Sequence, residues 1–159
     1  RFSFSVPLAS LPGGGAGLAA GSTLLTATAT VAGTGTSEFG GNVLLNAPPV
    51  ATNVTNATVL TTSGPVALTP GPAGTAFGPG NAVASYTLVS LPAIGGLFVD
   101  NGSTLVPAAA GQVVLAADLA RLRYQPAPNT PGQATFQFTV TDQNGAASGQ
   151  SYAAFRRGF

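Results

Sequence analysis

The chain has 159 residues, of which 6% are charged and 45% hydrophobic, with 22 Gly, 13 Pro and neither Cys nor His. This apolar content argues against disorder, and the lack of Cys excludes disulfides and thiolate metal sites. With a net charge of +1 and no apolar run near the roughly 20 residues that cross a bilayer, we expect neither nucleic-acid binding nor membrane insertion.

The first strand is expected at residues 2–8, where Phe2, Phe4, Val6 and Leu8 alternate with two Ser and one Pro. A two-residue period is that of a half-buried strand, and the proline restricts it to an edge. A glycine-rich stretch at residues 11–17 follows. The start at Arg1 lacks the layout of a signal peptide, so we expect a processed or excised piece of a longer exported precursor.

Two more strands are expected at residues 23–32 and 36–45, the first of them rich in β-branched Thr. Three strands are too few to close a two-sheet core. Pro48 and Pro49 then remove two successive ladder donors, which predicts a boundary at about residue 47. We therefore expect an N-terminal β-strand segment, either a partial sandwich or a donated strand, over residues 1–46, and a sandwich over residues 47–159.

The remainder of the chain predicts short strands separated by turns. Strands are expected at residues 54–61, 66–68, 83–90, 96–100, 104–106, 112–115, 122–124, 134–141 and 151–155, and one helical turn at residues 116–122. Asn101-Gly102 and Asn144-Gly145 are among the turn motifs between them. Such regular punctuation is typical of an all-β sandwich. The last strand is short and ends before two Arg, which predicts an open sheet edge at the C-terminus.

Residues 47–148 resemble the cadherin-like, immunoglobulin-like repeats of large bacterial surface and adhesin proteins. The resemblance rests on the Ala-Pro-Pro-Val linker at 47–50, on residues 83–92 and 96–100, and above all on residues 119–126 and 132–145. It implies an immunoglobulin-like Greek-key β-sandwich, here with an N-terminal β extension, placed in tandem outside the cell. Residues 1–46 resemble the closing strands of another bacterial surface repeat.

Catalysis is not expected, because the chain lacks the usual acid–base and nucleophilic groups. Without His, Cys or Lys, general base catalysis would fall to Glu38, Asp100, Asp118 and Asp142, which show no paired spacing. Ser and Thr are abundant, but a nucleophile needs an activating base. We therefore expect no enzyme activity, no catalytic residues and no cofactor.

Calcium is weighed separately because many cadherin-like repeats bind it through acidic loops. A hard cation needs six to eight oxygen ligands, whereas residues 69–80, which would supply acids, contain none. Asp100-Asn-Gly102 and Asp142-Gln-Asn-Gly145 are interpreted as turns, in which Asp or Asn bonds local backbone and Gly takes positive φ. We expect no metal site.

Three triplets starting at Asn53, Asn56 and Asn101 fit the N-glycosylation pattern, and we interpret them as solvated strand or turn residues. Phe136 and Phe138 share one strand face, which predicts core positions. Other aromatics expected to be buried or half-buried are Tyr86, Phe98, Tyr124 and Tyr152.

These features predict a secreted structural subunit of a bacterial filament or fibre, assembled by β-strand donation or addition between copies of itself. The donated strand would bury Phe2, Phe4, Val6 and Leu8 in the neighbouring subunit. Folding of this strand onto its own chain is the competing interpretation. The alternative function is a spacer or adhesive repeat of a long surface adhesin. A carbohydrate-binding module would need aromatics exposed on one face, which the pattern does not favour.

Overall fold

The computed structural model describes residues 46–78 and 80–158, together with the backbone of four short strands between residues 24 and 44. The chain divides into two compact units, Arg1–Ala47 and Pro48–Phe159. In the first unit, β1 (Leu24–Leu25) pairs antiparallel with β4 (Val43–Leu44), and β2 (Thr30–Val31) with β3 (Gly35–Thr36). These pairs lie in or beside the expected strands 23–32 and 36–45.

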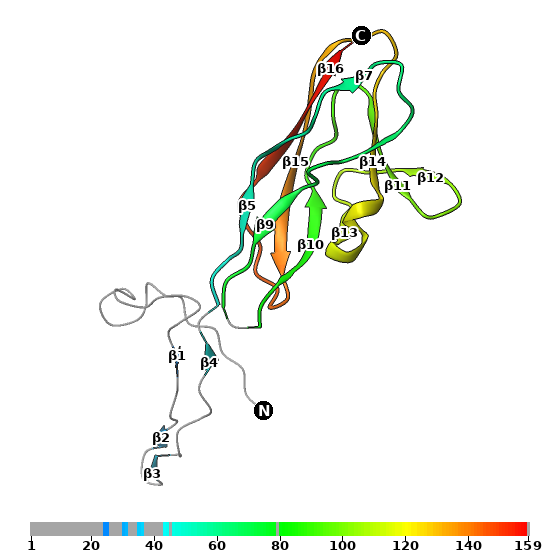
Figure 1. Cartoon of the computed structure of the whole chain (residues 1–159). Helices are drawn as coiled ribbons and strands as arrows, with labels where there is room; N and C mark the ends of the chain where they lie inside the picture. Colours follow the sequence, from blue (N-terminus) through cyan, green and yellow to red (C-terminus); the bar gives the residue numbers. More distant parts are fainter. Residues whose placement is uncertain are drawn as a thin grey trace. The chain divides into compact units, whose positions relative to one another are not determined.

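The second unit is a sandwich of two main sheets (Figure 1). The larger sheet has the order β13-β10-β15-β16-β6, with β7 also pairing with β16, and the smaller has the order β12-β11-β14-β8. A separate pair joins β5 and β9. The strand bounds are β5 (Val50–Thr52), β6 (Val54–Thr55), β7 (Val59–Leu60), β8 (Val66–Ala67), β9 (Ala73–Thr75), β10 (Val83–Leu88), β11 (Gly96–Asp100), β12 (Leu105–Pro107), β13 (Val113–Leu115), β14 (Leu122–Gln125), β15 (Gly132–Asp142) and β16 (Ser151–Gly158).

The longest strand, β15, forms the centre of the core. Its alternate residues Ala134, Phe136, Phe138 and Val140 are buried, while Gln137 between the two phenylalanines is exposed. This confirms the inward face expected from the sequence. Burial of each of the two Phe side chains and of Val140 contributes roughly 1.5–3 kcal/mol relative to the exposed state, so β15 stabilises the larger sheet along most of its length.

Aromatic rings link the two sheets. The rings of Tyr124 on β14 and Phe155 on β16 stack with centroids 4.3 Å apart and planes 9° apart. Phe136 lies next, 6.0 Å from Phe155. The Tyr124 hydroxyl donates a hydrogen bond to the carbonyl of Ile94 at 2.9 Å. Burial raises the pKa of Tyr124 above its ordinary value, and the positive charge of Arg157 partly offsets that increase.

One expectation about the C-terminal strand is wrong. β16 extends to Gly158 and is not an open edge, since it pairs antiparallel with β15 on one side and parallel with β6 and β7 on the other. The side chain of Asn53 reinforces this pairing, because its Oδ1 accepts the Tyr152 N–H at 3.0 Å. The expected strand 54–61 is thus two short strands, and both cover β16.

The remaining differences are local. Strands β5 and β9 were not expected, because each is three residues long and follows a proline. Tyr152 is 45% exposed rather than packed, because it lies opposite the exposed Gln137 on the outer face. The 3₁₀ helix Ala116–Arg121 confirms the helical character expected at residues 116–122, but its six residues make about two 3₁₀ turns rather than one. Within the described part of the chain, no helix has the length and apolar character to cross a membrane.

Candidate functional site

The predicted interface residues Phe2, Phe4, Val6 and Leu8 lie outside the described residues. Their burial in a neighbouring subunit therefore stays a prediction. Among the described residues, the candidate binding surfaces are two hollows and the edges of the two sheets, all in the second unit.

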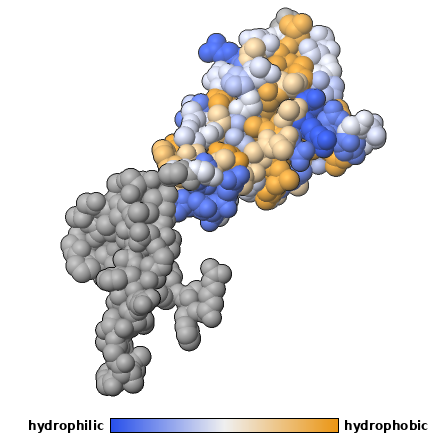
Figure 2. Space-filling model, turned by 60° about the horizontal axis from the view of Figure 1, so that its bottom comes forward, coloured by the Kyte–Doolittle hydropathy of each residue, from blue (hydrophilic) through white to orange (hydrophobic). Residues whose placement is uncertain are grey.

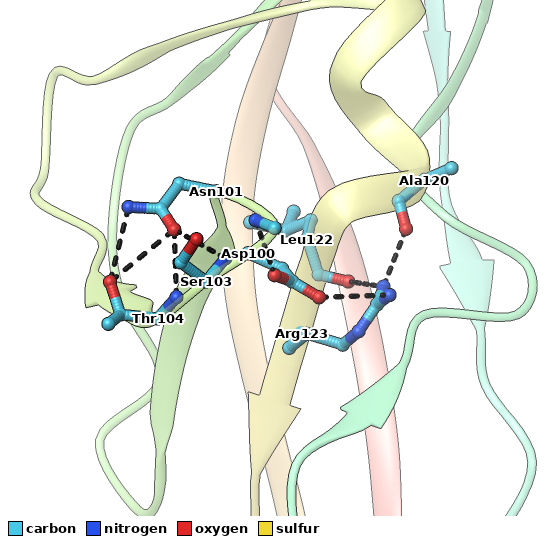
Figure 3. Close-up of polar contacts among 8 residues, drawn as sticks. Asp100, Asn101, Ser103, Thr104, Ala120, Leu122 and Arg123 are labelled. Carbon is cyan, nitrogen blue, oxygen red and sulfur yellow. Dashed lines mark hydrogen bonds and ion pairs between the residues drawn. The ribbon is translucent and has the colours of Figure 1, made fainter.

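The first hollow lies beside the turn between β11 and β12 (Figure 3). In that turn the Asp100 carboxylate accepts the Gly102 N–H at 2.9 Å, and the Asn101 Oδ1 accepts the N–H groups of Ser103 and Thr104 at 3.0 and 2.8 Å. Gly102 has φ 91°, a left-handed conformation that favours glycine. The interpretation of Asp100-Asn-Gly102 as a turn is confirmed.

Arg123 on β14 closes the other side of this hollow. Its guanidinium lies 3.6 Å from the second carboxylate oxygen of Asp100 and donates hydrogen bonds to the carbonyls of Ala120 and Leu122 at 2.5 and 3.3 Å. The hollow has a volume of about 350 Å³. Asp100 and Arg123 thus pair with each other and bind local backbone, an arrangement that fixes the turn.

The second acidic turn follows β15. One oxygen of the Asp142 carboxylate accepts the N–H groups of Asn144 and Ala146 at 3.0 and 2.8 Å, and the other accepts the Asn81 amide at 2.9 Å. Gly145 has φ 85°. The turn interpretation is again confirmed. The sequence did not predict the bond to Asn81, which joins residues 61 positions apart.

Calcium is expected not to change the thermal stability of the chain. Within the described residues, no three His, Cys, Asp or Glu side chains form a group that could hold a metal ion, and both turn carboxylates accept protein N–H groups. Scanning calorimetry with EDTA and then with excess calcium should give the same Tm. A rise of several degrees with calcium would overturn this prediction, because a ligand stabilises the state that binds it.

The glycosylation triplets differ in accessibility. Asn56 is buried, its Oδ1 accepts the Thr69 N–H at 2.7 Å, and its Nδ2 donates to the Ala154 carbonyl at 3.4 Å. Asn56 is therefore not the solvated residue expected from the sequence, and it joins β16 to the segment after β8. Asn53 and Asn101 are exposed, as expected.

The second hollow, the seam groove, lies between β7 and β8. It is lined by the segment that contains Val59 and Leu60, by Val66 and Ala67 of β8, and by the ring of Phe155, and none of its ten lining residues is charged. Its volume is about 270 Å³. Leu60 is 50% exposed, whereas Phe155 is fully buried. The groove thus offers an apolar floor that is continuous with the core. The sequence could not predict it, because Phe155 lies about 90 positions from Val66.

Strands β12 and β13 also carry exposed apolar side chains, apart from those of the seam groove. β13 ends the larger sheet and β12 ends the smaller one. The exposed side chains on them are Leu105 and Val106 on β12 and Val113 and Leu115 on β13. Figure 2 shows that apolar and weakly polar residues cover much of one face of this unit, with the strongly hydrophilic ones in a few groups. Uncharged strand edges of this kind are ready to pair with another strand.

A comparison with protein families finds that a model described as a bacterial Ig domain matches residues 46–153. Neither the curated proteins nor the solved structures yield a match to the chain. The family match confirms the immunoglobulin-like resemblance of residues 47–148 and agrees with the all-β sandwich described above.

Proposed function

The chain belongs to the bacterial Ig domain family, and from this membership we propose that it is a secreted structural subunit of an extracellular bacterial filament or fibre. Copies of the chain associate with one another by β-strand donation or addition. The observation that carries the proposal is that both main sheets end in uncharged strands with exposed apolar side chains, of which Leu60, Val106 and Val113 are examples. Sheet edges of soluble monomers usually carry charges or other devices that prevent such pairing.

The donated strand is the segment of residues 2–8. Four apolar side chains alternate on one face of it, and burying Phe2, Phe4, Val6 and Leu8 in a neighbour contributes about 6–10 kcal/mol before the cost of ordering, at roughly 1.5–3 kcal/mol each. Main-chain hydrogen bonds to the acceptor edge add register and direction. Since β16 is paired on both sides, the acceptor is one of the other sheet ends rather than the C-terminal strand.

The low charge of the chain supports association rather than catalysis. Near-zero net charge favours self-association, and the net charge here is +1 over 159 residues. The Asp100 and Asp142 carboxylates are engaged in turn hydrogen bonds, so they are poorly placed to act as general bases. We assign the chain no enzyme activity.

Deleting residues 1–10 is expected to give a folded, soluble monomer that forms no fibres, because the donor strand is gone while the sandwich is intact. Electron microscopy and sedimentation velocity on the full chain and on the deletion variant measure this. If the shortened chain still assembles normal fibres, strand donation is wrong. If it is instead monomeric with a clearly lower Tm, the segment packs on its own chain.

The second candidate function is a spacer or adhesive repeat of a long cell-surface protein. The observation in its favour is that the family match covers a single module, residues 46–153. For a spacer repeat, we expect the full chain to sediment as a monomer at every concentration and to show no fibres. The same two measurements therefore separate the two functions.

A further inference from the structure

The seam groove lies between two strands that each end a sheet. β8 pairs with β14 through Ala67↔Arg123 and Val66↔Tyr124, and is the last strand of the smaller sheet. β7 pairs with β16 through Leu60↔Gly158. Within the described residues, neither β7 nor β8 has a strand partner on its other side. A strand entering the groove can therefore continue one of the sheets.

The floor of the groove suits an aromatic side chain. Phe155 lines the groove but is fully buried, and it stacks on Tyr124 with ring centroids 4.3 Å apart, so a ring inserted in the groove would pack over this buried aromatic cluster. An apolar cavity of about 150 Å³ is known to hold a benzene ring. With about 270 Å³, the groove has room for one phenyl group. Its polar lining residues include the exposed Thr58 and Thr69, whose hydroxyl groups can bond an added backbone.

Prolines adjoin several sheet ends. β12 ends in Pro107, β5 follows Pro48 and Pro49, and β8 follows Pro65. A proline cannot donate to a ladder, so a strand added at any of these edges pairs through the residues beside the proline. β13 has neither proline nor charge, and its exposed Val113 and Leu115 line neither of the two hollows described above.

The occupant that fits the groove is a strand with large apolar side chains and no charge. Residues 2–8 meet both conditions, since they carry Phe2 and Phe4 two positions apart and contain no ionisable side chain. Side chains two positions apart on a strand lie on one face, roughly 6.5 Å from each other. When one phenyl ring enters the groove, the next apolar side chain therefore lies on the same face of the strand and can contact apolar lining residues such as Leu60 or Val66.

From these observations we infer that the seam groove is the acceptor site for residues 2–8 of a second copy of the chain, with a phenylalanine ring in the groove and the backbone added to β8. This inference rests on the proposed assembly by strand donation and names the surface that receives the strand. Neither partner carries a charge at the contact, so association is expected to depend only weakly on salt.

The test combines full-length variants with a peptide. Leu60→Glu and Ala67→Glu place a carboxylate at exposed positions of the groove, and Val113→Glu is the matched control, since Val113 is similarly exposed on the edge strand β13. Sedimentation velocity and electron microscopy report assembly, and Tm reports folding. We expect both groove variants to remain folded monomers and Val113→Glu to assemble like the unaltered chain.

The peptide separates binding from polymerisation. A fluorescent peptide of residues 1–10 is titrated into the chain that lacks these residues, and we expect Leu60→Glu and Ala67→Glu to weaken its binding at least tenfold, while Val113→Glu leaves it unchanged. If either groove variant misfolds, the other still gives the result. Peptide binding that both groove variants retain would overturn the acceptor assignment.

The outcomes distinguish this inference from the proposed function. If the deletion variant is monomeric while both groove variants still form fibres, donation stands and the groove is not the acceptor. Loss of assembly in Val113→Glu alone would assign the acceptor to β13. A full chain that is monomeric at all concentrations overturns donation between copies, and a lower Tm after the deletion would then show that the segment packs on its own chain.

Discussion

Replacing Phe136 by Ala is expected to lower the free energy of unfolding by about 3–5 kcal/mol, the usual cost of emptying a packed aromatic position. Phe136 is fully buried on β15 and contacts both Phe138 and Phe155 through ring interactions at 6.2 and 6.0 Å. Its loss leaves a cavity between the two sheets. Urea denaturation followed by circular dichroism measures the change through the transition midpoint.

Gln137→Ala is the matched control, because Gln137 is the next residue on the same strand and faces solvent. Substitutions at exposed positions usually change stability by less than about 0.5 kcal/mol. The denaturation midpoint of Gln137→Ala should therefore stay close to that of the unaltered chain. Coincident midpoints for the two variants would mean that the inward face of β15 is assigned wrongly.

Replacing Gly95 by Ala is expected to cost about 3 kcal/mol or more. Gly95 has φ 80°, and a left-handed conformation costs other residues about 1–2 kcal/mol. A methyl group here would also collide with the Gln125 carbonyl oxygen and lie 2.7 Å from the Tyr124 hydroxyl oxygen. Relieving such an overlap costs typically about 1–3 kcal/mol more. The backbone must approach this closely because Tyr124 bonds the neighbouring Ile94 carbonyl.

Gly102→Ala isolates the backbone contribution to this effect. Gly102 has φ 91°, yet no atom lies within 4 Å of the position that a methyl group would take. Its substitution should therefore cost only the conformational strain of about 1–2 kcal/mol. Comparing the two variants by urea denaturation gives the steric term by difference. Equal losses of stability would show that the contact with Gln125 and Tyr124 relaxes without cost.

The sequence predicted those elements whose evidence is local. β15 could be found because Phe136, Phe138 and Val140 alternate with polar residues in the sequence, and the turns at Asp100 and Asp142 because Asp, Asn and Gly give each turn its own hydrogen bonds and positive φ. The boundary before residue 48 followed from two adjacent prolines. In each case the pattern that determines the structure lies within about ten residues.

What the sequence did not predict depends on pairing between distant segments. β16 seemed to be an edge because nothing near residues 151–158 indicates that Val54 and Val59 pair with it in parallel. Asn56 resembled a solvated glycosylation site, yet it is buried by contacts with Thr69 and Ala154. The seam groove also combines β7, β8 and Phe155. The spacing of neighbouring residues in the sequence does not indicate such long-range contacts. They form only when the strands pair and the two sheets pack together.

The parallel pairing of β6 and β7 with β16 has a mechanical consequence. Val54 lies beside Ala153 and Leu60 beside Gly158, so the first and last strands of the larger sheet run in the same direction. The chain therefore enters and leaves this sheet at opposite ends. Tension applied to the two ends pulls the strands past each other and loads their hydrogen bonds in shear, all at once rather than one after another. Under such a load the hydrogen bonds between the strands share the force and must break together. A sheet loaded in shear therefore resists extension far better than one whose strands are peeled apart one hydrogen bond at a time.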